Sequence, residues 1–315
     1  MKIAINGRDL LNQNTGTHVY LTNLLNHISQ IDRKNSYVIY IPSKGYSKAA
    51  SLVPRVSNFS VLKIKNSLSW THFSISKALF KNQPNIYFTS EHTIPLIKPA
   101  KTKIVSMIHG LEHKKNNIKL SLIKKAIYNL SFENLLRNSD LIITPSDFVK
   151  KELSKTVSKE RVRVVYEGVS SNFLKRSFDE SKVILKKYGL LESSYILCVS
   201  TLQPRKNYLR IIEAFSDTLK KTKYQIKLCI VGKKGWQYEE ILELPKKLGI
   251  ENNVMFSEGL KDEELAVLYS NAVLYLNASM EEGFCLPILE AQSCEALCLV
   301  SEIPTFKELC NGSVI

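Results

Sequence analysis

The sequence alternates between short apolar runs, rich in β-branched and aromatic residues, and longer amphipathic stretches. Each run is continuous, without interspersed polar residues, as expected for strands buried on both faces of a parallel sheet. In the first half the runs occupy residues 2–6, 37–41, 86–88, 104–108, 141–144 and 162–166. Between the first two, residues 17–31 carry an apolar stripe at helical spacing: Val19, Leu21, Leu24, Leu25, Ile28 and Ile31. This order predicts βαβ units and the α/β fold class.

The pattern restarts after a polar stretch, residues 167–182, in which we place the linker. Further strands are predicted at 195–199, 227–231, 254–256, 273–277 and 298–300, and helices at 207–221, 236–248, 262–270 and 287–295. Asn207 is a candidate helix cap, the third helix is expected to open at Lys261 and Asp262, and Pro287 suits a first helical turn. We therefore predict two Rossmann-like domains, 1–172 and 173–315. Such a pair commonly binds a nucleotide-containing ligand, and oxidoreductases, kinases and glycosyltransferases all fit.

The net charge of +15 is unevenly distributed along the chain. Residues 1–175 contain 27 Lys and Arg against 10 Asp and Glu, whereas the remainder is nearly balanced. This excess suggests a nucleic acid, an anionic membrane surface or an acidic substrate as partner, although a codon bias toward Lys explains part of it. Residues 113–137 are interpreted either as a basic amphipathic helix that docks on an anionic membrane or as an ordinary helix packed on the sheet. The basic positions are Lys114, Lys115, Lys119, Lys124 and Lys125, and the apolar ones are Leu120, Ile123, Ile127 and Leu130.

All six cysteines lie in the second half, and five of them sit in apolar runs, which is typical of buried thiols in a reducing cytosol. Cys294 and Cys298 are four residues apart, but no His or third Cys completes a zinc site. No apolar run approaches the ~20 residues of a membrane span, and no signal peptide is evident. We expect a cytoplasmic protein, at most peripheral on the inner face of the cytoplasmic membrane.

Residues 200–207 follow a predicted strand and contain the adjacent cations Arg205 and Lys206. A guanidinium beside an ammonium suits a diphosphate, although for this segment taken alone a solvated loop is the favoured explanation.

Residues 280–294 are more informative. Glu282 and Gly283 precede a helix that contains Glu290 in its first turns. Glycine lets a ligand approach the backbone, a helix N-terminus favours phosphate, and carboxylates accept hydrogen bonds from sugar hydroxyls.

EGFCLPILEA resembles the EGFGLPxLEA element of retaining glycosyltransferases of family 4, including its two glutamates eight residues apart. Further matches follow in the family's order: TGTHVYLTNLL, IHGLEH, ITPSDFVKKEL, VVYEGV, VSTLQPRKNYLRIIEAF, IVGKKGW and DEELAVLYSNA. The family has the GT-B fold, with two Rossmann-like domains facing across a cleft. The chain is similar to bacterial mannosyltransferase-like members that extend surface polysaccharides such as lipopolysaccharide.

The resemblance implies that Arg205 and Lys206 hold the donor diphosphate. It implies that Glu282 contacts the donor sugar and Glu290 the nucleotide ribose. The amides that would meet the phosphates and sugar belong to Gly283, Phe284, Cys285 and Leu286.

In the first domain, the resemblance gives Gly16 a place where the backbone approaches the diphosphate. It places His109 beside the anomeric carbon and the sugar hydroxyls.

The implied reaction moves a hexose, with mannose as a candidate, from a nucleotide sugar to a lipid-linked or oligosaccharide acceptor on the N-terminal domain, with retention. The cations and a helix N-terminus would stabilise the leaving diphosphate, so neither a metal ion nor a cofactor is expected. Lys206→Ala and Glu282→Ala are expected to lower turnover while the fold survives. Two alternatives are a truncated, inactive nucleotide-sugar-binding remnant and a nucleic-acid-binding protein, for which the first half offers no recognisable module.

Several positions depart from the family pattern. Cys285 and Glu295 stand where the family usually has Gly, Gly110 where Asp often follows the His, and Thr201 where many members have Arg. Cys285 is small and therefore expected to be tolerated, whereas Glu295 is expected to be strained if its φ is positive. Because family members continue through further helices, we expect a C-terminally truncated second domain with low stability or activity.

Overall fold

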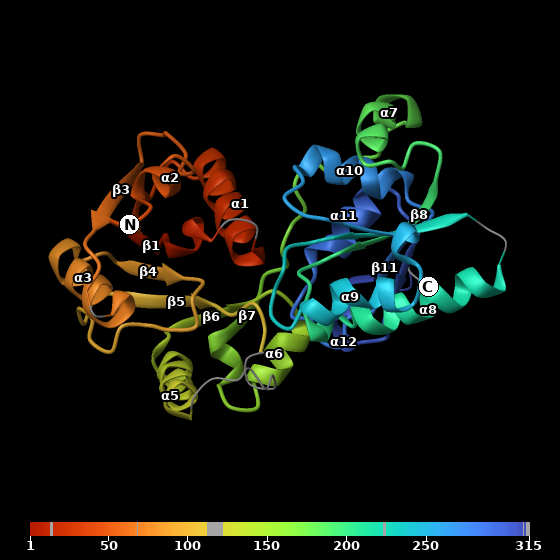
Figure 1. Ribbon diagram of the computed structural model, residues 1–315. Coiled ribbons are helices and arrows are strands. Elements are labelled where there is room, and N and C mark those ends of the chain that lie inside the picture. Colours follow the sequence, from red (N-terminus) through yellow and green to blue (C-terminus); the bar gives the residue numbers. More distant parts are fainter. Residues whose placement is uncertain (13–14, 68, 112–121, 223–224, 311, 313–315) are drawn as a thin grey trace. The chain divides into compact units, whose positions relative to one another are not determined.

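The computed structural model describes residues 1–315 except 13–14, 68, 112–121, 223–224, 311 and 313–315. The chain forms two compact units, Met1–Glu167 and Gly168–Ile315. This division falls slightly before the boundary predicted between residues 172 and 173. Each unit is a parallel sheet with helices on both faces, as Figure 1 shows. The predicted α/β class is therefore confirmed.

The first unit is built on a seven-stranded parallel sheet in the order β3-β2-β1-β4-β5-β6-β7. Its strands are β1 (Lys2–Asn6), β2 (Ser36–Pro42), β3 (Phe59–Ile64), β4 (Ile86–Thr89), β5 (Lys103–Met107), β6 (Leu141–Thr144) and β7 (Val162–Val164). The six predicted strands are all present, and β3 was missed. It lies at the sheet edge, and polar Ser60 and Lys63 interrupt its apolar pattern because no strand covers its outer side.

Helices cover both faces of this sheet (Figure 1). The helices α1 (Gly16–Ile31) and α2 (Tyr46–Ala50) pack on one face, and α3 (Ser76–Asn82), α5 (Leu122–Asn138) and α6 (Asp147–Leu153) on the other. Short helical turns occupy Arg8–Leu11, Trp70–Ile75 and Lys159–Arg161.

The predicted helix at 17–31 is confirmed as α1, but its apolar stripe is narrower than expected. Leu21 and Leu25 are fully buried, whereas Val19 and Ile31 are exposed. The buried stripe follows the i, i+4 spacing of a helix, and Val19 and Ile31 fall outside it.

The second unit has a five-stranded parallel sheet in the order β10-β9-β8-β11-β12. All five strands were predicted: β8 (Ser194–Val199), β9 (Ile226–Val231), β10 (Val254–Ser257), β11 (Leu274–Asn277) and β12 (Cys298–Val300). The helices α8 (Tyr208–Lys221) and α9 (Glu239–Lys247) cover one face, and α7 (Phe178–Lys187), α10 (Asp262–Asn271) and α11 (Leu286–Ser293) the other. The last helix, α12 (Pro304–Cys310), adds Phe306 and Cys310 to the core of the second face.

Two local predictions were wrong. Helix α7 begins inside the stretch assigned as linker, where Ser177 and Glu180 form a reciprocal capping box. That signal was present in the sequence, but α7 buries only Ser181 and Leu185, so its apolar pattern is weak. Asn207 precedes α8 with φ 62° and its side chain makes no capping hydrogen bond. By contrast, α10 opens at Asp262 as predicted.

Three helices of the second unit end in the same Schellman motif, and two of them have glycine at the left-handed position. Gly189 (φ 64°) follows α7, and Gly249 (φ 69°) follows α9. After α11 the equivalent residue is Glu295, with φ 58°. Its amide donates to the Gln292 carbonyl, and the next amide donates to the Ala291 carbonyl, both at 2.9 Å. The positive φ on which the expectation of strain at Glu295 depends is therefore present.

Candidate functional site

In the second unit the strand order reverses between β8 and β11, and parallel α/β sheets bind ligands beyond the carboxyl ends of the strands at such a point. The chain after β8 forms a 3₁₀ turn, Pro204–Lys206, that carries both predicted cations. The loop after β11 carries Glu282. The topology thus brings together two segments that are about 75 residues apart in the sequence.

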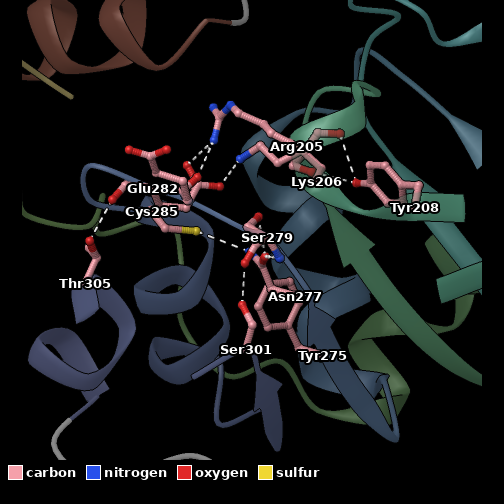
Figure 2. A network of polar contacts seen from close by, with 12 residues as sticks. Arg205, Lys206, Tyr208, Tyr275, Asn277, Ser279, Glu282, Cys285, Ser301 and Thr305 are labelled. Carbon is pink, nitrogen blue, oxygen red and sulfur yellow. Dashed lines mark hydrogen bonds and ion pairs between the residues drawn. The ribbon is translucent and has the colours of Figure 1, made fainter. Parts of the chain in front are cut away.

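Arg205, Lys206 and Glu282 form one ion-pair cluster (Figure 2). The Arg205 guanidinium Nη1 lies 2.7 Å from Glu282 Oε2 and also donates to the Glu281 carbonyl at 2.8 Å. Lys206 Nζ donates to the other Glu282 oxygen, Oε1. Only 8% of Lys206 and 6% of Glu282 is exposed. The structure therefore unites these three predicted site residues and buries two of them.

The charges in this cluster do not cancel. Burial acts to raise the pKa of Glu282, but the charges and hydrogen bonds of Lys206 and Arg205 together hold it below its ordinary value. The carboxylate is therefore ionised at neutral pH, and the three side chains carry a net charge of about +1. An anion placed beside the two cations would be attracted by this remaining charge.

Hydrogen bonds tie the two loops to each other and to the rest of the unit. The Met280 amide donates to the Arg205 carbonyl at 2.9 Å. Thr305 Oγ1, on α12, donates to the Glu282 carbonyl at 2.6 Å. Asn277 Oδ1 accepts from the Ser279 amide at 3.1 Å. The supporting roles of these residues were missed, although Asn277 and Ser279 stand at the end of β11, where polar residues indicate a site.

Gly283 and Phe284 are buried in the loop before α11, and Leu286 begins that helix. Pro287 lies in the first turn, as predicted. Cys285 has φ 100° in the left-handed region, and its Sγ lies 3.3 Å from Asn277 Nδ2. The expectation that Cys285 is tolerated because it is small was incomplete. Its backbone conformation favours glycine whatever the size of the side chain.

Glu290 lies in α11, and Tyr269 of α10 donates a hydrogen bond from its hydroxyl to Glu290 Oε2 at 3.1 Å. Burial raises the pKa of Glu290 to about 7, although this hydrogen bond acts in the opposite direction. Near neutral pH the carboxyl is therefore partly protonated, and hydroxyl donors from a ligand would favour its ionised form. The predicted ribose contact stays a prediction.

Two further predicted residues belong to the first unit. Gly16 is the first residue of α1, and a Cβ added there would meet nothing within 4 Å. His109 follows β5, and its Nδ1 lies 2.9 Å from Glu167 Oε1. Glu167 was not predicted as a site residue. It follows β7, and His109 follows β5, so both lie beyond the carboxyl ends of strands of the same parallel sheet.

The first unit also has a polar cluster at its own reversal of strand order, between β1 and β4. Asn6 Nδ2 donates to Glu91 Oε2 at 2.8 Å, and Arg8 Nη1 lies 3.3 Å from Glu91 Oε1. Ser90 Oγ donates to Asp9 Oδ2 at 2.6 Å. Burial raises the pKa of Glu91 in spite of the Arg8 charge. None of these residues was predicted, although Asn6 ends β1 and Ser90 and Glu91 follow β4, where polar residues indicate a site.

Within the described residues, no group of three or more His, Cys, Asp or Glu side chains is arranged to hold a metal ion. In the same part of the chain, no helix combines the length and apolar character needed to cross a membrane.

Two family models match the chain, and each covers most of one unit. Residues 14–173 match the model described as Glycosyltransferase Family 4, and residues 181–312 match Glycosyl transferases group 1. The chain belongs to glycosyltransferase family 4.

Curated relatives of this family 4 chain include two O-antigen enzymes. O-antigen chain mannosyltransferase B of Escherichia coli is 30% identical over 57% of the chain, which spans about half (48%) of that relative. O-antigen chain mannosyltransferase RfbU of Salmonella typhimurium is 28% identical over 87% of the chain and 73% of the relative.

Solved structures show the same fold at low sequence identity. Anabaena Alr3699/HepE in complex with UDP and glucose has a TM-score of 0.74 at 16% identity, over 98% of this chain and 83% of that one. WaaG, a glycosyltransferase involved in lipopolysaccharide biosynthesis, has a TM-score of 0.70 at 16% identity, over 96% and 81%. The predicted GT-B fold is therefore confirmed.

Proposed function

We propose that this family 4 chain transfers a hexose, with mannose as the first candidate, from a nucleotide sugar to a lipid-linked or glycan acceptor in surface polysaccharide synthesis. The observation that carries the proposal is the cluster of Arg205, Lys206 and Glu282 at the strand reversal of the second unit. The O-antigen mannosyltransferases among the relatives support the choice of sugar and process.

The cluster suits a donor that is anionic at one end and rich in hydroxyls at the other. A diphosphate is the natural partner of a guanidinium beside an ammonium, because both make charge-assisted hydrogen bonds to phosphate oxygens. A carboxylate that is ionised next to them accepts hydrogen bonds from sugar hydroxyls. Glu282 therefore orients the hexose while Arg205 and Lys206 hold the diphosphate.

The reaction breaks the bond between the anomeric carbon and the diphosphate oxygen and forms a bond from that carbon to the acceptor oxygen. Positive charge grows on the sugar and negative charge on the diphosphate. Arg205 and Lys206 are in place before the bond breaks, so they stabilise the leaving group without reorganisation. The anomeric configuration is retained, and a leaving phosphate oxygen takes the acceptor proton.

Donor binding and transfer are tested separately. Saturation-transfer NMR with UDP-, GDP- and ADP-sugars identifies the donor, and a transfer assay with a lipid-linked acceptor then measures turnover. Glu282→Gln keeps an oxygen that accepts hydrogen bonds, but a thermal melt must accompany it because losing one charge of a buried ion pair typically costs about 3–5 kcal/mol of stability. Lys206→Ala needs a thermal melt alongside it for that reason. Wild-type transfer by either variant would contradict the assignment, and donor binding without transfer would favour an inactive binding protein.

The proposal includes contact of the first unit with an anionic membrane surface, where a lipid-linked acceptor is held. His92 Nδ1 lies 2.9 Å from the Tyr128 hydroxyl, so the loop after β4 is joined to α5. On this loop and helix, four large apolar side chains are mostly exposed: Leu96, Ile97, Ile127 and Leu130. The alternative of an ordinary helix packed on the sheet holds for α5 through the buried Phe132, Leu135 and Leu136, but not through Ile127 and Leu130.

The basic positions Lys114, Lys115 and Lys119, with Leu120, lie outside the described residues, and the side chains of Ile123, Lys124 and Lys125 are not described either. Co-sedimentation with vesicles of anionic and of neutral lipid tests the contact. An Ile127→Ser, Leu130→Ser double variant is expected to weaken binding to anionic vesicles. Equal binding to anionic and neutral vesicles, unchanged in the double variant, would contradict contact of this face with an anionic surface.

A further inference from the structure

Three separate segments of the first unit hold His109. The residue follows β5, and the Ile108 amide before it donates to the Ile143 carbonyl at 2.9 Å. The Glu167 carboxylate lies 2.9 Å from Nδ1 of the imidazole. The Tyr20 ring, on α1, meets the imidazole edge-on, with centroids 4.7 Å apart and planes at 83°. The position and rotation of the imidazole are thus fixed from different directions.

The His109 and Glu167 side chains are only 20% and 8% exposed. The second ring nitrogen, Nε2, is buried and has no hydrogen-bond partner among the described residues. A buried polar atom without a partner is unfavourable in the free protein, so Nε2 is a candidate for pairing with a ligand.

The carboxylate decides which ring nitrogen carries the proton. An ionised carboxylate can only accept hydrogen bonds, so Nδ1 must be the protonated nitrogen. Nε2 of the neutral ring then presents a lone pair. The negative charge next to Nδ1–H also strengthens Nε2 as an acceptor, as a carboxylate partner does for metal-binding histidines.

We propose that Glu167 is a positioning residue that holds His109 in the Nδ1–H tautomer, so that Nε2 accepts a hydrogen bond from a hydroxyl of the bound hexose. The inference rests on the proposed function, because it takes the ligand of His109 to be the sugar. Glu167 is the last residue of the first unit and precedes Gly168. The Val165 amide donates to the Thr144 carbonyl at 2.9 Å and fixes the start of this segment.

The first test reads the tautomer and needs no activity. The six histidines are labelled with ¹⁵N on the ring, and the His109 signals are assigned by their loss in His109→Gln. At pH 8 the wild-type spectrum is expected to show a protonated Nδ1 and an unprotonated Nε2. Glu167→Gln keeps an amide oxygen that accepts from Nδ1 and is expected to retain this tautomer, whereas Glu167→Ala shifts the population toward Nε2–H. An unchanged tautomer in a folded Glu167→Ala variant overturns the proposal.

The second test measures transfer. Glu167→Ala is expected to lower kcat by roughly 10–100-fold, the range found when a metal-binding histidine loses its hydrogen-bond partner, with little change in KM for the donor. Glu167→Gln recovers most of this loss. The exposed Glu160→Ala, also in the first unit, is the control and keeps wild-type turnover and tautomer. A Glu167→Ala variant that changes tautomer but transfers at the wild-type rate refutes the role. A wild-type chain that transfers no sugar, with the Nδ1–H tautomer intact, refutes the proposed function instead.

Discussion

Replacing Glu295 by glycine should stabilise the second unit, because Glu295 occupies a position built for glycine. Its φ of 58° lies in the left-handed region, at the end of the Schellman motif that closes α11. The side chain is exposed, so the substitution removes no core packing. Gly189 and Gly249 fill the same position after α7 and α9. The structure thus provides its own comparison within a single unit.

The expected magnitude follows from three contributions. A left-handed conformation costs a residue with a Cβ roughly 1–2 kcal/mol, and glycine avoids that cost. A negative charge at the C-terminus of a helix is unfavourable by about 0.3–1 kcal/mol, and its removal adds to the gain. Against these, the greater backbone freedom of glycine in the unfolded chain costs about 0.5–1 kcal/mol. Glu295→Gly should therefore gain about 1 kcal/mol, or about 3 °C in Tm for a unit of this size.

Urea unfolding followed by the fluorescence of Trp236 measures this gain. A Trp70→Phe background leaves Trp236, in the second unit, as the single tryptophan. Glu295→Ala removes the charge but keeps the Cβ, so it should gain less than Glu295→Gly. Gly249→Ala should lower the free energy of unfolding by about 1 kcal/mol, because alanine is strained at the positive φ of this position. A Cβ there meets no atom within 4 Å, so the variant measures the effect of φ alone. Equal stability of the alanine and glycine variants at position 295 would refute the argument from backbone strain.

Three further predictions concern the second unit. Cys285→Gly should relieve backbone strain at φ 100°, but it also removes a side chain packed against the core. The two effects oppose each other, so the free energy of unfolding in urea should change by less than about 1 kcal/mol. Cys285→Ala, which keeps a Cβ, should destabilise the unit. The folded chain keeps the Glu290 proton up to about pH 7, whereas the unfolded chain loses it near pH 4.5. The free energy of unfolding should therefore fall by up to about 3 kcal/mol as the pH rises through that window, and Glu290→Gln should abolish this slope. The pKa of Glu282 is lowered in the folded chain, so its contribution to stability is present above its unfolded pKa and is lost as the pH falls. Glu282→Gln should therefore lose less stability on acidification in the same titration.

Much of the fold follows from patterns that the sequence displays openly. A strand buried on both faces must be apolar along its whole length, and every central strand was located for this reason. The edge strand β3 and the capped but weakly apolar α7 were missed because neither buries a full face. Local backbone angles at Cys285 and Glu295 were foreseen only as departures from a family motif, since φ depends on the surrounding structure.

The candidate site shows a similar division between what spacing reveals and what packing decides. Arg205, Lys206 and Glu282 were each identified, but only the parallel order of β8 and β11 explains why they meet. Their mutual pairing has a chemical consequence that no motif indicates. If the proposed function is correct, a donor diphosphate competes with the Glu282 carboxylate for the same two cations, and its binding releases Glu282 oxygens to accept from sugar hydroxyls. A nucleoside diphosphate without the hexose leaves those oxygens without their new partner, and the intact nucleotide sugar should therefore bind more tightly than the bare diphosphate.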